Sequence, residues 1–208
     1  MYDAVLFDLD GTLVDTEILA QRAGLAAFAA LGHPVDVTFM HSLVGKDGPA
    51  SEAIISAAMP TLDIIAFNAL WGAGFKAGLT ADLPIKPGVR ELLAAISLPC
   101  AVVTSSGRTQ AAHKLTLTDL TQFFETVVVI EDVVHAKPAP DPFLLAAQRL
   151  GVSPTRCLVF EDSDTGAEAA HRAGCTVVQV PDTQPTTGPF AHFVAPDLLT
   201  GARMAGLL

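Results

Sequence analysis

The sequence is poor in charged residues, in cysteine and in long apolar runs. Only 16% of its 208 residues are charged, and 22 acidic against 12 basic residues leave a formal net charge of −10. Nucleic acids and anionic membranes are gripped by clusters of Lys and Arg, so this shortage of basic residues argues against both as partners. No run approaches the about 18 apolar residues that a membrane span requires. We therefore expect a small-molecule partner, with no nucleic acid and no membrane.

The three cysteines, Cys100, Cys157 and Cys175, form no CxxC pair and no metal-ligand spacing, and their number is odd. This usage predicts reduced, mostly buried thiols, as in a cytosolic protein. The N-terminus lacks the basic start of a secretory signal. The expectation is a soluble, cytoplasmic protein that is a monomer or a weak homo-oligomer.

What the sequence does contain is hydrophobic residues, which make up half of the chain and exclude disorder. Five short runs are rich in β-branched residues, at 4–7, 101–104, 127–130, 158–160 and 176–180. Near-continuous hydrophobicity suits strands buried on both faces of a parallel sheet. Helical patterns such as 88–96 and 143–150 lie between the later runs, so we predict a doubly wound α/β sheet.

Residues 15–85 interrupt this alternation, because they contain no convincing strand. Their Ala/Leu-rich stretches, such as 18–31 and 54–79, have a helical pattern. We predict a small all-helical domain at 15–85, inserted into an α/β core formed by 1–14 and 86–208. The tail after residue 181 is expected to be mostly loop, with one short helix near Leu198.

The strongest local pattern is FDLDGT at residues 7–12, directly after the first apolar run. Ligands of parallel sheets bind beyond the carboxyl ends of the strands, and the i, i+2 spacing lets Asp8 and Asp10 project toward one site there. Gly11 allows the backbone to turn sharply and to approach a ligand closely. A calcium loop is excluded, since its glycine is the sixth residue and here it is the fourth. An acidic turn without function is the alternative for this pattern alone.

A second acidic pair, Glu161 and Asp162, ends the run 158–160. Two such pairs at the ends of buried strands are costly to place together without a cation. Hard oxygen ligands of this kind suit Mg²⁺. Either pair alone could be a solvated loop, but together they favour a metal site.

Two polar segments could bind an anion. TSSG at 104–107 offers hydroxyls and backbone N–H groups at an expected helix start, which is a phosphate-binding arrangement, although plain helix capping would also explain it. Lys137 lies in a proline-stiffened loop after the third run. A solvated lysine is the alternative there.

These four elements, DLDGT, TSS, KPAPDP and EDSDTG, occur in an order that resembles the haloacid dehalogenase superfamily. The resemblance covers residues 3–182 and is to the branch with a helical cap after the first strand. The sequence is similar to the sugar-phosphate phosphatases and β-phosphoglucomutase-like members, whose first motif also continues as DGTLVDTE. The resemblance implies a Rossmann-like core, dependence on Mg²⁺ and a cap within 15–85.

The resemblance also implies roles for individual residues. Asp8 would be the nucleophile, and Asp10 would be the general acid and then the general base. Thr104, the N–H of Ser105 and Lys137 would bind the transferring phosphoryl oxygens. Mg²⁺ would be held by Asp8, the backbone carbonyl of Asp10, Glu161 and Asp162.

Substrate selection is expected from the cap and the loops around the site. Lys46 falls where relatives place a substrate loop, and Arg108 could reach a second anionic group, although either could simply be solvated. The expected substrate-binding set is Gly11, Thr12, Thr16, Lys46, Ser105, Ser106 and Arg108.

The function implied is a Mg²⁺-dependent phosphatase that acts on a small phosphate ester through an aspartyl-phosphate. The candidate substrates are a sugar phosphate, a sugar-acid phosphate or phosphoglycolate. A phosphosugar mutase is the alternative, but Ala20 stands where such relatives carry a histidine. A catalytically inactive ligand-binding relative is disfavoured by the intact Asp8, Asp10, Lys137 and Asp162.

Overall fold

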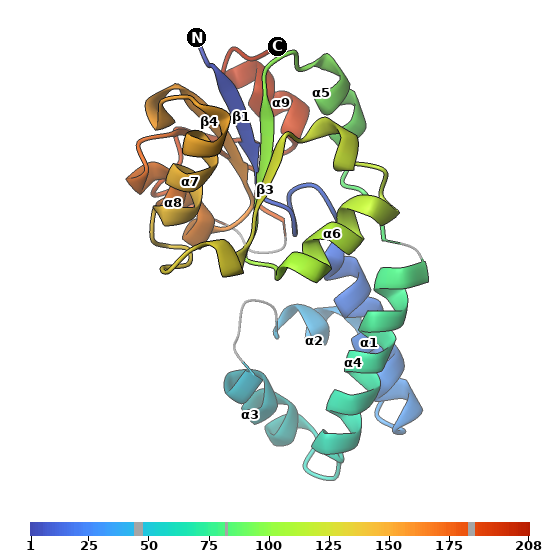
Figure 1. The fold of residues 1–208 in the computed structure, drawn as a ribbon. Helices are drawn as coiled ribbons and strands as arrows, with labels where there is room; N and C mark the ends of the chain where they lie inside the picture. The colour runs from blue at the N-terminus through green and yellow to red at the C-terminus, as the bar shows by residue number, and fades with distance from the viewer. Residues whose placement is uncertain (44–47, 82, 183–185) are drawn as a thin grey trace. The chain divides into compact units, whose positions relative to one another are not determined.

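The computed structural model describes residues 1–43, 48–81, 83–182 and 186–208. It divides into two compact units (Figure 1). The first unit comprises Met1–Asp15 and Pro84–Leu208, and the second comprises Thr16–Leu83.

The first unit is built on a six-stranded parallel sheet with the order β3-β2-β1-β4-β5-β6. Its strands are β1 (Ala4–Phe7), β2 (Cys100–Val103), β3 (Thr126–Val128), β4 (Cys157–Glu161), β5 (Thr176–Gln179) and β6 (Phe193–Val194). The predicted doubly wound α/β fold is confirmed, and each of the five apolar runs contributes a strand. The tail also contains β6, which was expected to be loop. Two residues are too few to give a period-2 pattern.

The central strand β1 is where the direction of winding changes, since β2 and β3 lie to one side of it and β4, β5 and β6 to the other. Every residue of β1, β2 and β4 is buried, which explains their unbroken hydrophobicity. Phe7 of β1 stands opposite Phe160 of β4, and their rings stack with centroids 5.1 Å apart. In a sheet wound this way, ligands bind at the carboxyl ends of the strands beside the switch point.

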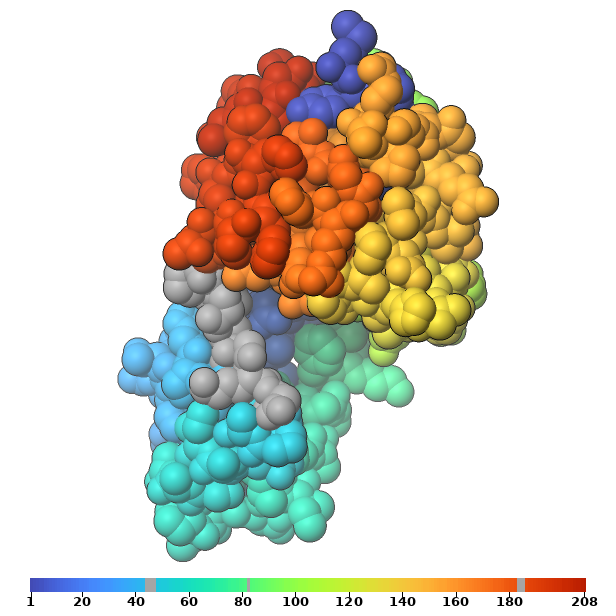
Figure 2. Space-filling view, turned by 90° about the vertical axis from the view of Figure 1, so that its left-hand side faces the viewer, coloured from blue at the N-terminus to red at the C-terminus, as the bar shows by residue number. Residues whose placement is uncertain are grey.

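Helices cover both faces of this sheet, with α7 and α8 on one face and α5 and α9 on the other (Figure 1). In Figure 2 the segments from β4 to the C-terminus, in orange to red, form much of the visible surface of the first unit. The α-helices are α5 (Val89–Ala95), α6 (Arg108–Leu117), α7 (Asp141–Leu150), α8 (Asp164–Arg172) and α9 (Leu198–Met204), and the 3₁₀ turns are η1 (Thr121–Phe123), η2 (Ile130–Asp132) and η3 (Pro154–Arg156).

The described part of the second unit is helical, with α1 (Thr16–Ala30), α2 (Val37–His41), α3 (Gly48–Ala58) and α4 (Ile64–Ala81). The helices α1 and α4 pack against each other, and Phe28 and Phe67 meet in the core with ring centroids 4.2 Å apart. The indole Nε1 of Trp71 donates to the Ala20 carbonyl at 2.8 Å.

The helical pattern over 54–79 is broken in the structure, where residues 59–63 separate α3 from α4. Pro60 cannot continue a helix that precedes it, because its ring removes a donor and clashes with the preceding turn. Asp63 then starts α4, since its Oδ1 accepts hydrogen bonds from the N–H groups of Ile65 and Ala66, each at 3.0 Å.

The three cysteines are free and buried, as predicted. A search of the described helices finds none that is both long enough and apolar enough to cross a membrane.

Candidate active site

The turn after β1 brings Asp8 and Asp10 to the carboxyl end of the sheet. The N–H of Asp8 still donates to the Phe160 carbonyl at 2.9 Å, so the nucleophile candidate is held in register with β4. The chain then turns at Gly11, which has a φ of +88°. A Cβ atom at this position would lie 2.4 Å from Asp162 Oδ2. Glycine is therefore required both by the backbone conformation and by the close approach to a carboxylate.

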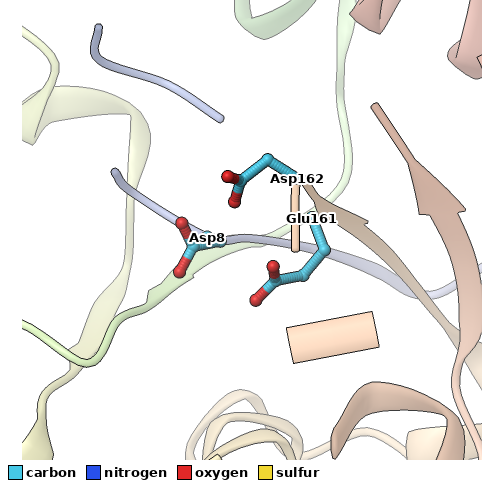
Figure 3. A group of neighbouring side chains, drawn as sticks. All are labelled: Asp8, Glu161 and Asp162. Carbon is cyan, nitrogen blue, oxygen red and sulfur yellow. The ribbon is translucent and has the colours of Figure 1, made fainter. Parts of the chain in front are cut away.

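Three carboxylates gather between the ends of β1 and β4. Asp8, Glu161 and Asp162 each offer an oxygen, and these oxygens lie within 4.8 Å of one another. Figure 3 shows the three groups turned toward a common space. Glu161 is almost fully buried, and it fits because residue 166 is glycine, where a Cβ atom would lie 1.8 Å from Glu161 Oε1. This donor set can hold a metal ion.

The pKa values of Asp8 and Asp162 indicate that one neighbouring cation, Lys137, does not balance the three carboxylates. Burial raises the pKa of Asp8 to about 7, despite the opposing charge of Lys137 and with a further rise from Glu161. Burial likewise raises the pKa of Asp162 to about 9, helped by repulsion from Asp8 and Glu161. Carboxylates that resist ionisation in this way are stabilised when a cation joins them.

Lys137 is the buried cation beside Asp8 and Glu161. Its Nζ donates to Asp8 Oδ1 at 2.7 Å, to Glu161 Oε1 at 2.6 Å and to the Val103 carbonyl at 2.8 Å. Burial alone would lower the pKa of Lys137, but the charges of Asp8 and Glu161 raise it above its usual value. Lys137 therefore stays protonated beside the carboxylate of Asp8.

A cavity of about 430 Å³ opens over these groups. Most of the predicted site residues of the first unit meet there. The described residues that line it are Asp8, Asp10, Thr104, Ser105, Ser106, Gln110, Lys137, Asp162, Ser163, Thr165 and Gly166.

The segment after β2 forms one wall of this cavity. The Ser106 N–H donates to Thr104 Oγ1 at 3.0 Å, which folds the segment back on itself before α6. The Ser106 hydroxyl donates to Asp10 Oδ2 at 2.7 Å. The segment therefore supports Asp10, and its residues Thr104, Ser105 and Ser106 line the cavity.

Sequence reasoning missed Lys114, whose Nζ donates to Asp10 Oδ1 at 2.5 Å and to Ser106 Oγ at 3.0 Å. A signal was present, because Ala111, Lys114 and Leu115 have the i, i+3, i+4 spacing of one helix face, and the structure buries all three. A lysine on the apolar face of a helix needs a partner in the interior.

Four more lining residues were missed, namely Gln110, Ser163, Thr165 and Gly166. The EDSDTG pattern contained a signal for three of them. Ser163 caps α8 by accepting from the Gly166 N–H at 3.1 Å, which is the behaviour expected of Ser three residues before a helical N–H.

The remaining predicted residues lie in different surroundings. The Thr12 hydroxyl is buried and has no hydrogen-bond partner within the described part of the chain. Arg108 pairs with Asp132 Oδ1 at 2.5 Å and is not among the described lining residues. Thr16 begins α1 in the second unit, and Lys46 lies outside the described residues. Substrate contacts by these four residues stay predictions.

Comparison with known proteins identifies the family of this chain. A protein-family model for haloacid dehalogenase-like hydrolases matches residues 2–174. The chain belongs to this family. The predicted resemblance is thus confirmed, and the carboxylates, Lys137 and the Ser/Thr segment of this haloacid dehalogenase-like protein all lie within the matched residues.

Its relatives include named phosphatases. The fructose-1-phosphate phosphatase YqaB of Escherichia coli is 36% identical over 86% of this chain and 96% of its own length. A phosphorylated carbohydrates phosphatase of Thermotoga maritima is 32% identical over 83% of this chain and 82% of its own. A crystal structure of a family hydrolase from Deinococcus radiodurans R1, with bound phosphate and sodium, has a TM-score of 0.83 and 29% identity, and covers 99% of this chain and 95% of that one.

Proposed function

We propose that this protein is a Mg²⁺-dependent phosphatase that hydrolyses phosphate monoesters of small carbohydrates. The observation that carries the proposal is the meeting of Asp8, Asp10, Lys137 and Asp162 around one cavity. The names of the two phosphatase relatives support a phosphorylated carbohydrate as the substrate.

The two aspartates divide the chemistry. An oxygen of Asp8 attacks phosphorus, the bond from phosphorus to the ester oxygen breaks, and the leaving oxygen takes a proton from Asp10. Water then attacks the aspartyl-phosphate, Asp10 accepts its proton, and inorganic phosphate leaves with Asp8 restored. The division suits their surroundings, because Lys137 holds Asp8 while Ser106 and Lys114 hold Asp10.

The surrounding groups stabilise the charge of the transferring phosphoryl group. Lys137 brings a permanent positive charge beside Asp8, and Thr104 and the N–H of Ser105 line the same cavity. Fixed charges in a buried site cost no reorganisation during the reaction.

The acidic trio fits Mg²⁺, which prefers oxygen ligands and accepts only one or two carboxylates with further oxygens around it. Asp8, Asp162 and the backbone carbonyl of Asp10 would hold the ion. Glu161, which the family resemblance also implies as a ligand, is proposed here to support them from its buried position beside Lys137. When bound, Mg²⁺ supplies charge neutralisation to the phosphoryl oxygens.

The helical residues 15–85 are proposed as the cap that selects the substrate. Hydrolysis is favoured over transfer of the phosphoryl group within a sugar. Mutase-like relatives carry a histidine at the position of Ala20, and the methyl group of Ala20 cannot exchange a proton as a histidine can. The backbone carbonyl of Ala20 serves the packing of the helical unit by accepting from Trp71.

The direct test is a phosphate-release assay on hexose phosphates, hexitol phosphates, sugar-acid phosphates and phosphoglycolate, in Mg²⁺ or in EDTA. We expect release from one or more carbohydrate esters in Mg²⁺ only, and none from Asp8→Asn. A rearranged phosphorylated product without free phosphate would favour the mutase. Failure to act on any ester in Mg²⁺ would overturn the proposal.

A further inference from the structure

The two aspartates of the DLD segment are each paired with a different buried lysine. Lys137 donates to Asp8, and Lys114 donates to Asp10 at 2.5 Å. Lys137 comes from the loop before α7, whereas Lys114 comes from the last turn of α6. The general acid/base candidate therefore has a cation of its own.

Lys114 is buried, with only 8% of its side chain exposed. Ala111 and Leu115 on the same helix face are fully or almost fully buried. Placing an ammonium group there is costly unless partners compensate it, and Lys114 Nζ donates to Asp10 Oδ1 and to Ser106 Oγ. The burial of Lys114 is thus tied to the position of Asp10.

Asp10 is held on both oxygens, Oδ1 by Lys114 and Oδ2 by Ser106. It nevertheless keeps 29% of its side chain exposed and lines the cavity. Each carboxylate oxygen has two lone pairs, so a group fixed in this way can still exchange a proton with a ligand. A carboxylate with one donor on each oxygen has its side-chain rotation restricted.

We propose that Lys114 is a positioning residue that fixes the Asp10 carboxylate for proton transfer to the leaving oxygen. Lys114 acts through Asp10, because it is not among the described residues that line the cavity. The inference rests on the proposed phosphatase function and adds a residue to its acid step.

The test compares two esters of similar shape, phenyl phosphate and p-nitrophenyl phosphate. Phenolate is a poor leaving group that gains from protonation, whereas p-nitrophenolate departs readily without it. For Lys114→Met we expect kcat/KM to fall about tenfold or more on phenyl phosphate and less than about threefold on p-nitrophenyl phosphate, a part of what proton transfer contributes. Lys114→Arg, which keeps a cationic donor, should recover most of the loss.

A double-mutant cycle separates positioning from packing. In an Asp10→Asn background, Lys114→Met should cause no further change in the ratio of the two kcat/KM values. Thr118→Val is the matched control, because the Thr118 hydroxyl donates to the Lys114 carbonyl at 2.7 Å and does not contact Asp10. It should leave that ratio unchanged. Thermal unfolding of each variant checks the fold, and Lys114→Gln replaces Lys114→Met if the latter does not fold.

Equal losses on both esters, or an effect that persists without the Asp10 carboxylate, would overturn the assignment of Lys114 while wild-type activity remains. A wild-type protein that releases phosphate from neither aryl ester nor any sugar ester would overturn the proposed function, and the role of Lys114 with it. The two failures are distinguished by the wild-type measurement.

Discussion

Gly11 lies against the carboxylate of Asp162, so closely that a Cβ atom on residue 11 would come within 2.4 Å of Asp162 Oδ2. The contact joins the turn after β1 to the end of β4. A side chain at position 11 cannot be added without moving a proposed metal ligand.

Gly11→Ala is therefore expected to weaken both folding and metal binding. The positive φ costs about 1–3 kcal/mol for a residue with a Cβ atom, and the displaced Asp162 should lower Mg²⁺ affinity by about tenfold or more. Isothermal titration with Mg²⁺ measures the second effect. Gly151→Ala is the matched control, since Gly151 has a φ of +70° and nothing within 4 Å of its Cβ position. It should lose stability but keep its Mg²⁺ affinity.

Gly166→Ala should destabilise the protein although the position is helical. Replacing an exposed glycine inside a helix by alanine normally stabilises the protein by about 0.5–1 kcal/mol. At Gly166 the new Cβ atom would lie 1.8 Å from Glu161 Oε1, which has no room to retreat because it is buried and bonded to Lys137. Gly72→Ala, in α4 with open space around its Cβ position, should shift stability the opposite way. Urea unfolding of both variants tests this difference in sign.

Lys137→Met should destabilise the metal-free protein by about 3–5 kcal/mol, because it leaves Asp8 and Glu161 without the cation between them. The loss in the free energy of unfolding should be larger at pH 8 than at pH 6. At pH 6 protonation of Asp8 relieves its repulsion with Glu161. Urea unfolding in EDTA at the two pH values measures it. A loss that does not depend on pH would contradict this explanation.

The metal-free protein should lose stability as the pH rises. Burial raises the pKa of Asp8 to about 7 and that of Asp162 to about 9, both from the usual aspartate value of 3.8. Between the unfolded pKa of 3.8 and these raised values, the folded state binds more protons than the unfolded state. The free energy of unfolding therefore falls as the pH rises from about 4 to about 9.

Mg²⁺ should reverse this trend, because it binds the ionised carboxylates. We expect the rise in Tm between EDTA and Mg²⁺ to grow from pH 6 to pH 9 and to shrink in Asp162→Asn. A larger rise at pH 6 than at pH 9 would show that Asp8 and Asp162 do not hold the ion.

Much of the fold could be predicted because its signals are local. The strands of the sheet are short apolar runs, and burial on both faces imposes that composition on each of them. The order of the strands is not local, since β1 and β4 pair across more than 150 residues. The break at Pro60 was missed because the apolar helical pattern resumes on both sides of it.

The site shows the same limit. Asp8, Asp10, Glu161 and Asp162 could be proposed from sequence because each pair lies at the carboxyl end of an apolar run that forms a strand. Lys114 could not be assigned, because its partner Asp10 is 104 residues away and only the packing of α6 brings the two together. Its burial was predictable from the helical spacing, but the carboxylate it meets was not.

The stacked rings of Phe7 and Phe160 occupy the positions immediately before the two acidic motifs. A slip of one residue between β1 and β4 would turn these rings, and every neighbour, to the wrong face of the sheet. The spacing between Asp8 and the pair of Glu161 and Asp162 is therefore set by the register of β1 against β4. Substitutions in the loops or in the helical unit can therefore alter the surroundings of the site without changing the spacing of these carboxylates.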